Sequence, residues 1–228
     1  MWAAWEVGAW KVLREHIQPD LIVGASAGAW NGWAIAGGCN PAELYEQWMD
    51  PATAKILYRA IHPLGFFGPQ VLYERARELY DRFRPRIPFA LTMVEVPRLR
   101  VHIVRDRDIR WEHLAAACAI PFGFPPVKID GKRFVDGCFR GALPLWAAEQ
   151  LGATRAVALN VMTAPIFRIL RFSTRAGVPS PALEVQRIEP SERLGSLRDA
   201  IAWSAVNIQR WIALGERDAK RALSSVRM

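Results

Sequence analysis

The first third of the chain alternates between two hydrophobic patterns. Residues 2–16 place Trp2, Trp5 and Val12 at the spacing of one helical face, which predicts an amphipathic helix. Residues 20–23 form a short apolar run typical of a buried parallel strand. The alanines and tryptophans of residues 27–36 favour a second helix that ends at a glycine pair. The opening pattern is therefore helix, strand, helix.

The same alternation continues along the chain. Apolar spacing, caps and prolines predict further helices over 42–49, 70–83, 111–119, 144–151 and 196–223, the last as one long or two broken helices. Strands are expected over 89–96, 99–104, 127–129, 133–135 and 156–161, with Asp130-Gly131 as a hairpin turn. Alternating strands and helices indicate an α/β fold whose sheet is mostly parallel in its core. Without an internal repeat or a linker, we expect one domain over residues 1–228.

Composition agrees with one globular domain, because 228 residues with 51% hydrophobic and 23% charged side chains can bury a sizeable core. No apolar run is long enough to cross a bilayer, and the N-terminus does not read as a signal peptide. Three cysteines, Cys39, Cys118 and Cys138, are an odd number without metal-ligand spacing. Together these features predict reduced thiols and a cytoplasmic protein.

The net charge of +8 is concentrated toward the C-terminus, where residues 163–228 carry eleven basic and six acidic side chains. Such a surface can attract nucleic acid or anionic lipid, although interleaved acids favour an arginine-rich solvated face. Residues 165–172 mix large apolar groups with arginine and contain no acid. That composition fits either a segment lying in a membrane interface or a packed edge whose arginines snorkel. We expect no nucleic-acid partner, because no recognition motif is present.

The candidate chemistry begins at Gly24-Ala25-Ser26-Ala27-Gly28, directly between the predicted strand and the next helix. This Gly-x-Ser-x-Gly pattern is typical of a nucleophile elbow, where small neighbours leave the serine hydroxyl clear at a helix N-terminus. The alternative is a glycine-lined turn that only closes a strand-helix unit or cradles a phosphate. A Walker loop is excluded, because no Gly-Lys-Ser/Thr follows.

A serine nucleophile needs a base within hydrogen-bond reach. The four histidines are His16, His62, His102 and His113, and none occurs after residue 113. An α/β-hydrolase places its histidine late in the chain, so that template ranks second. Asp136 is the stronger candidate, because it ends the strand over 133–135 and enters Gly137, where active sites of open α/β sheets collect.

Several segments together resemble the patatin-like phospholipase family. Residues 4–13 and 19–29 are similar to its first helix and nucleophile elbow, and residues 119–121, 124–127, 129–131 and 135–137 are similar to its second block. The likeness extends over residues 4–162 and is thinner over 163–228. It implies a three-layer α/β fold with a mostly parallel central sheet.

This resemblance also implies a function. The protein would be a lipid acyl hydrolase acting on phospholipid or carboxylic esters, with Ser26 as nucleophile and Asp136 as sole base. The dyad would work through an acyl-enzyme, with Gly137 and Cys138 in the aspartate loop and no metal or organic cofactor. Its partners would be a lipid ester substrate and, peripherally, a membrane. The phenylalanines Phe66, Phe67, Phe122, Phe124, Phe167 and Phe172 would line the acyl channel or touch the membrane, or else pack in the core.

Two departures from the family pattern carry consequences. Cys138 stands where the family has Gly or Ala, and a side chain there costs about 1 kcal/mol if the backbone has positive φ. The family's first strand and glycine-rich oxyanion loop would precede Ala4, so we expect both to be missing from this chain. We interpret the chain as part of a longer active protein. The alternative is a catalytically impaired module that binds lipid or a partner.

Overall fold

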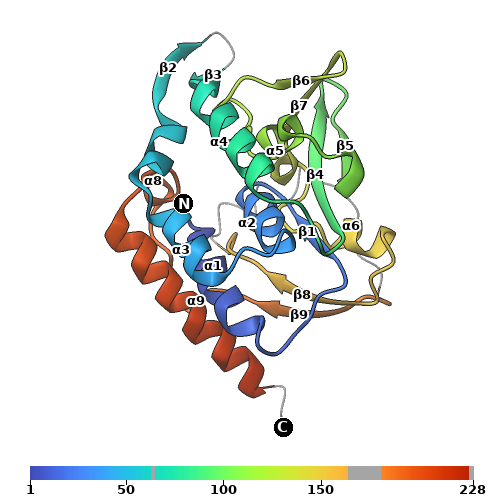
Figure 1. Cartoon of the computed structure of the whole chain (residues 1–228), viewed down its shortest axis with the longest axis vertical. Coiled ribbons are helices and arrows are strands. Elements are labelled where there is room, and N and C mark those ends of the chain that lie inside the picture. Colours follow the sequence, from blue (N-terminus) through green and yellow to red (C-terminus); the bar gives the residue numbers. More distant parts are fainter. Residues whose placement is uncertain (63–64, 164–180, 226–228) are drawn as a thin grey trace.

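The computed structural model describes residues 1–62, 65–163 and 181–225 (Figure 1). Its α-helices are α1 Ala4–Leu13, α2 Ala27–Ala36, α3 Pro41–Met49, α4 Pro69–Arg82, α5 Trp111–Ala117, α6 Leu145–Gln150, α8 Leu197–Ile201 and α9 Ala205–Ser225. Its strands are β1 Ile22–Gly24, β2 Arg59–His62, β3 Gly65–Phe67, β4 Phe89–Val96, β5 Arg100–Arg105, β6 Val127–Ile129, β7 Lys132–Asp136, β8 Arg155–Leu159 and β9 Glu184–Ile188. Three 3-10 helices, η1 Pro51–Leu57, η2 Asp106–Asp108 and η3 Gly137–Phe139, complete the described elements.

The central sheet is built around β4, which is buried along nearly its whole length. β5 pairs antiparallel with one edge of β4. The other edge is shared: β1 pairs parallel with Phe89, Ala90 and Leu91, and β7 pairs antiparallel with the stretch from Met93 to Val96. β1 and β7 therefore run toward each other along one edge, and their C-terminal ends meet near Thr92.

The expected α/β fold is observed, and its central sheet is mixed, with one parallel and three antiparallel pairs among the described strands. Parallel pairing occurs at β1–β4 and at β8–β9, which form a separate two-stranded sheet. The remaining described pairs are antiparallel. Short connections fold β4 onto β5 and β6 onto β7 as hairpins. The β6–β7 turn is the predicted Asp130-Gly131, where both residues have positive φ.

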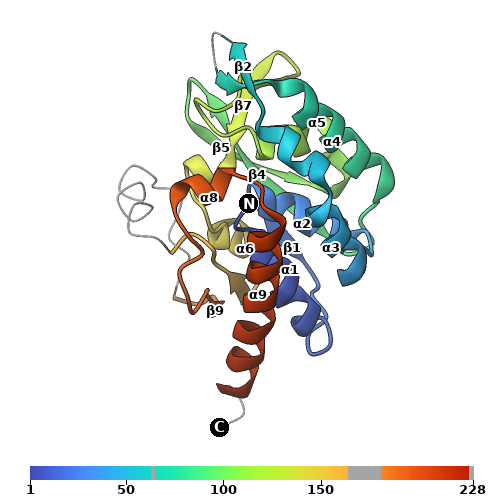
Figure 2. The same ribbon diagram turned by 90° about the vertical axis from the view of Figure 1, so that its left-hand side faces the viewer.

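Helices cover the sheet as layers. Figure 2 shows α2, α4 and α5 gathered on one side of β4, and α6 contacts β1 and β8. α9 runs along α1 at very short range, since a Cβ on Gly8 would lie 1.8 Å from the carbonyl oxygen of Ile212. A buried hydrogen bond of 2.9 Å from the Trp5 indole to Asp218 joins the same two helices. The first and last described helices therefore form one unit.

The predicted and observed elements differ mainly in the short ones. The sequence patterns did not predict β2, β3, η1 or β9, which are brief and lack a clear hydrophobic period. The predicted helix over 196–223 is observed as its broken alternative, α8 followed by α9. None of the helices in the described parts of the chain is both long and apolar enough to span a membrane.

Candidate active site

Ser26 occupies a sharp turn between β1 and α2. Its backbone has φ 53° and ψ −137°, a conformation that side chains rarely adopt, and it is the N-cap residue of α2. The hydroxyl makes no capping hydrogen bond, so it is not committed to the helix. Gly24 allows the turn, because a Cβ there would lie 2.5 Å from Cα of Ala29. The pattern that predicted a nucleophile elbow therefore forms a strained strand-to-helix turn.

Asp136 approaches the serine from the opposite direction, at the C-terminal end of β7. The Ser26 hydroxyl donates a hydrogen bond of 2.6 Å to Oδ2 of Asp136. The Cys138 backbone N–H donates to Oδ1 at 2.8 Å, and the Asp136 N–H donates to the Ala119 carbonyl at 2.9 Å. Both the carboxylate and its backbone are thus fixed by hydrogen bonds.

Close packing under the aspartate loop explains why glycine follows Asp136. A Cβ on Gly137 would lie 2.4 Å from both the carbonyl oxygen and Oγ1 of Thr92. Thr92 is the β4 residue between the segments paired with β1 and β7. Any larger residue at 137 would push the loop away from β4, and the Asp136 carboxylate would move away from Ser26.

Burial makes Asp136 a stronger base than an ordinary aspartate. The side chain is 2% exposed, and this desolvation raises its pKa from 3.8 to about 6. Hydrogen bonds from Ser26 and Cys138 stabilise the carboxylate and oppose the rise. At neutral pH the group is therefore ionised and basic enough to accept a hydroxyl proton.

Cys138 fits its position without backbone strain. It lies in η3 and is not among the described residues with positive φ, so the cost considered for a side chain there does not arise. Burial and the nearby Asp136 carboxylate hold the pKa values of the Cys138 and Cys118 thiols well above their usual range. Both thiols are therefore protonated at neutral pH and are poor nucleophiles.

A cavity of about 230 Å³ begins at the serine and continues between α3, η1 and α4. Ser26 and Ala27 form one end of the cavity wall. The rest of the wall is mainly apolar and includes Leu44, Trp48, Ile56, Leu57, Leu72, Leu79, Phe83, Ile120, Phe124 and Ile201. The arrangement places the Ser26 hydroxyl, with its Asp136 partner, at one end of an apolar space.

The phenylalanines proposed for a channel are placed differently from one another. Phe124 is buried and lines the cavity, and Phe67 packs on it with ring centroids 5.4 Å apart. Phe66 and Phe122 do not line it and are 67% and 78% exposed. The stretch containing Phe167 and Phe172 lies outside the described residues.

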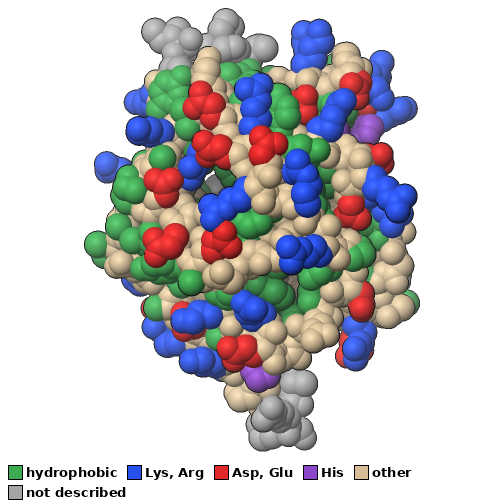
Figure 3. All heavy atoms as spheres, viewed as in Figure 1, with side chains coloured by type: hydrophobic (Ala, Val, Ile, Leu, Met, Phe, Trp, Pro, Cys, Tyr) green, Lys and Arg blue, Asp and Glu red, His purple; other side chains and the backbone are tan. Residues whose placement is uncertain are grey.

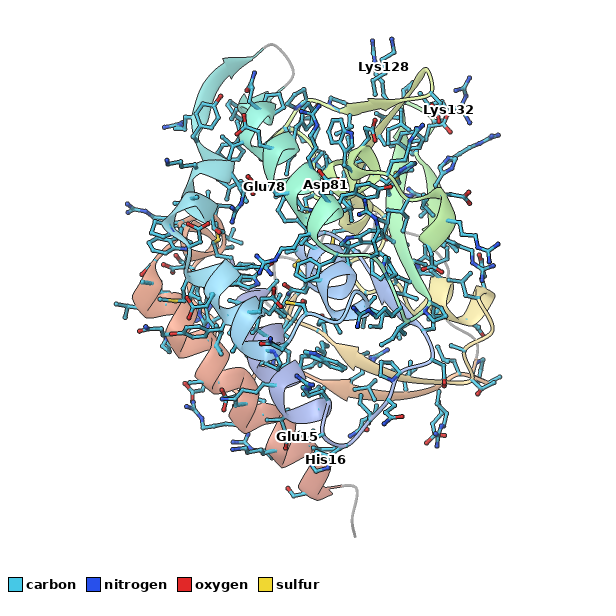
Figure 4. The ribbon with its side chains drawn as sticks, viewed as in Figure 1. Glu15, His16, Glu78, Asp81, Lys128 and Lys132 are labelled. Carbon is cyan, nitrogen blue, oxygen red and sulfur yellow. The ribbon has the colours of Figure 1, made fainter. Side chains whose placement is uncertain are left out.

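The described histidine side chains lie away from the Ser26 hydroxyl, which is hydrogen-bonded to Asp136. His16 lies at the end of α1 remote from the dyad, at the bottom of Figure 4. His102 pairs with Glu95 at 2.9 Å, and His113 accepts the Arg110 backbone N–H at the start of α5. Desolvation lowers the pKa of His113. None of these three histidines contacts Ser26 in the structure as described.

Sequence reasoning missed most of the cavity wall and a buried network behind the elbow. The signal for the wall was the apolar face of α4, where the sequence pattern predicted a helix over 70–83 and no cavity. In the network, Asn31 donates to Glu6 at 2.8 Å and accepts from the Trp48 indole at 2.9 Å. Burial raises the pKa of Glu6 to about 7. The network joins α1, α2 and α3 beside the cavity.

In a comparison with protein-family models, residues 1–149 match the model described as patatin-like phospholipase. The matched stretch covers more than half of the chain and contains both Ser26 and Asp136. It ends within α6 and so includes β1, β4 and β7, the three strands that position the dyad.

Proposed function

Because this chain belongs to the patatin-like phospholipase family, whose activity is in general that of a lipid acyl hydrolase, we propose that it cleaves lipid esters with Ser26 and Asp136 as a catalytic dyad. The observation that carries this proposal is the 2.6 Å hydrogen bond between the Ser26 hydroxyl and the Asp136 carboxylate. The raised pKa of Asp136, about 6, supports the role of base.

In the first step, Ser26 Oγ attacks the ester carbonyl carbon while its proton moves to Oδ2 of Asp136. The carbonyl oxygen becomes an oxyanion, and the N–H of Ala27, the residue after the nucleophile, is the donor placed to stabilise it. The α2 dipole favours the same negative charge. When the tetrahedral intermediate collapses, the C–O bond of the ester breaks and Asp136 returns its proton to the leaving alcohol.

In the second step, water replaces the alcohol. Asp136 removes a proton from the water, and the hydroxide attacks the acyl-enzyme carbonyl. Collapse releases the fatty acid, and the proton returns from Asp136 to Ser26 Oγ. One carboxylate therefore acts as base and acid in turn, and no histidine is required.

The apolar cavity explains why a lipid ester suits this dyad. Ser26 and Ala27 border the cavity, so an acyl chain inside it would bring its ester to the nucleophile. Burial of each methylene is favourable by about 0.8 kcal/mol, so an ester with a long acyl chain should bind more tightly than an acetate ester. We expect kcat/KM for p-nitrophenyl esters to rise as the acyl chain lengthens.

Two substitutions test the dyad. Ser26→Ala and Asp136→Asn should each lower p-nitrophenyl butyrate hydrolysis by more than about a thousandfold. Ser224→Ala and Asp20→Asn are matched controls at exposed positions away from the cavity and should keep full activity. A fluorophosphonate should label Ser26 in the unsubstituted protein. Substantial hydrolysis by either dyad variant would refute the assignment, and absence of labelling would favour a binding module.

A further inference from the structure

Large hydrophobic side chains are exposed around the mouth of the cavity. Among the described residues, six of the ten exposed large hydrophobics lie on segments that line the cavity or pack against its lining, and we call these six the mouth patch: Tyr58, Phe66, Ile120, Phe122, Leu197 and Ile201. Ile120 and Ile201 both expose surface and line the cavity itself. In Figure 1, β2 and α8 lie on the left-hand side, and this side faces the viewer in Figure 2.

The most exposed member of the patch is also in an unfavourable backbone conformation. Phe122 is 78% exposed with φ 64°, at a turn closed by a 3.0 Å hydrogen bond from the Gly123 N–H to the Ile120 carbonyl. A bulky residue with positive φ costs about 1 kcal/mol or more, and glycine or asparagine would avoid that cost. Neither burial nor the turn explains phenylalanine here, so its exposed ring points to a contact outside the molecule.

The turn is joined to the rest of the patch and to the dyad. The Phe66 N–H donates to the Phe122 carbonyl at 3.3 Å, which places the two exposed rings on neighbouring segments. On the inner side, the Ala119 carbonyl accepts the Asp136 N–H. Whatever binds the patch is therefore held at the entrance that leads to Ser26.

Cations without an ion-pair partner among the described residues border the patch. Lys55 and Arg59 are exposed beside Tyr58, and Arg198 is exposed between Leu197 and Ile201. The acidic side chain at the same cavity, Glu78, is already paired with Arg75 at 3.0 Å. In Figure 3, hydrophobic side chains gather along the left-hand edge, with Lys and Arg as well as Asp and Glu beside them.

From this combination we infer that the mouth patch docks the protein on the surface of an anionic phospholipid bilayer, with Phe122 and Phe66 inserted among the lipids and Lys55, Arg59 and Arg198 at the headgroups. Apolar rings flanked by basic side chains are the composition of an interfacial binding surface. The inference deepens the proposed function and rests on its lipid substrate. A docked mouth lets a lipid enter the cavity without crossing water.

Vesicle co-sedimentation of the inactive Ser26→Ala protein tests docking without any catalytic turnover. We expect binding to vesicles of equimolar phosphatidylcholine and phosphatidylserine, and weaker binding to phosphatidylcholine alone. Adding Phe122→Asn should weaken binding to both by about tenfold. Arg59→Gln and Arg198→Gln should each weaken binding about fivefold, to the anionic vesicles only.

A closely matched control is Leu99→Asn. Leu99 is also exposed and has φ 53°, but it lies in the β4–β5 connection and does not border the cavity. It should bind vesicles as the parent protein does. Phe122→Asn should unfold at the same temperature as the parent protein or at a higher one. If Phe122→Asn does not fold, Phe66→Ser supplies a second test of docking.

Three binding results would overturn docking. These are a parent protein that does not bind anionic vesicles, binding by Phe122→Asn as tight as that of the parent, and a loss of binding in Leu99→Asn as large as that in Phe122→Asn. A dimer that dissociates on Phe122→Asn would make a second copy the occupant and would also overturn it. Hydrolysis of soluble p-nitrophenyl butyrate by the unsubstituted protein reports on the dyad separately, so failure of docking and failure of the proposed function are distinguishable.

Discussion

Replacing the buried carboxylate of Asp136 with an amide should stabilise the protein relative to the unsubstituted parent, and this difference in stability should grow as the pH rises. Burial raises the pKa of Asp136 from 3.8 to about 6, so the folded state holds this proton more tightly than the unfolded chain does. Between pH 4 and pH 7 the unsubstituted protein must ionise the desolvated group, and it loses stability as it does so. A difference of about two pKa units corresponds to about 3 kcal/mol.

Asp136→Asn removes that cost while keeping the local hydrogen bonds. The amide oxygen accepts from the Cys138 N–H, and the amide nitrogen donates to Ser26 Oγ. The free energy of unfolding of the variant minus that of the parent should therefore increase by about 2 kcal/mol from pH 4 to pH 7, with nearly half of the increase by pH 5. The pH dependence is the diagnostic quantity, because constant differences in packing cancel.

Urea unfolding followed by tryptophan fluorescence measures this difference at each pH. Glu6, with its pKa raised to about 7, titrates in both proteins and cancels in the subtraction. Asp20→Asn is the control, because it makes the same exchange of carboxylate for amide at an exposed position. A flat difference for Asp136→Asn would mean that burial does not raise the pKa of Asp136, and it would remove the physical basis for its role as base.

Three further predictions follow from the site and the helix packing. Hydrolysis of p-nitrophenyl butyrate should fall as the pH drops through about 6, where Asp136 becomes protonated; a pH–rate profile of kcat/KM with no acidic limb near 6 would contradict this. Gly24→Ala should lower the melting temperature and activity, because its Cβ would meet the α2 backbone at 2.5 Å, whereas Gly28→Ala has 3.6 Å of space and should fold normally. Gly8→Ala should cost more than about 3 kcal/mol in urea unfolding, because its Cβ would lie 1.8 Å from the Ile212 carbonyl oxygen; a stability equal to the parent would show that α1 and α9 separate freely.

Patterns that depend on local chemistry could be predicted from the sequence. The elbow was recognisable because a strand, a Gly-x-Ser-x-Gly turn and a helix follow one another within about fifteen residues. The hairpin at Asp130-Gly131 was recognisable because this dipeptide suits positive φ. The long helices and β4 likewise carry their own periodic or continuous apolar pattern.

Features that depend on tertiary placement could not be predicted in this way. The sequence cannot tell that Phe124 lines the cavity while Phe122, two residues earlier, is exposed, because both belong to one turn with the same composition. The pairing of β1 and β7 with the same edge of β4 likewise cannot be predicted from the sequence, since these two strands are more than one hundred residues apart. The pKa of Asp136 follows from burial, which only the assembled fold determines.

Because β1 and β7 meet head to head on β4, the proposed hydrolysis depends on the register of both strands. Strands advance about 3.3 Å per residue and alternate their side chains, so a slip of one position on β4 would break the 2.6 Å contact and turn one partner to the opposite face. During refolding, helices and hairpins can form early, yet esterase turnover must wait until both long-range pairings are in place. The rate at which esterase activity recovers would thus report when both strands have paired with β4, which a spectroscopic measure of helix content cannot do.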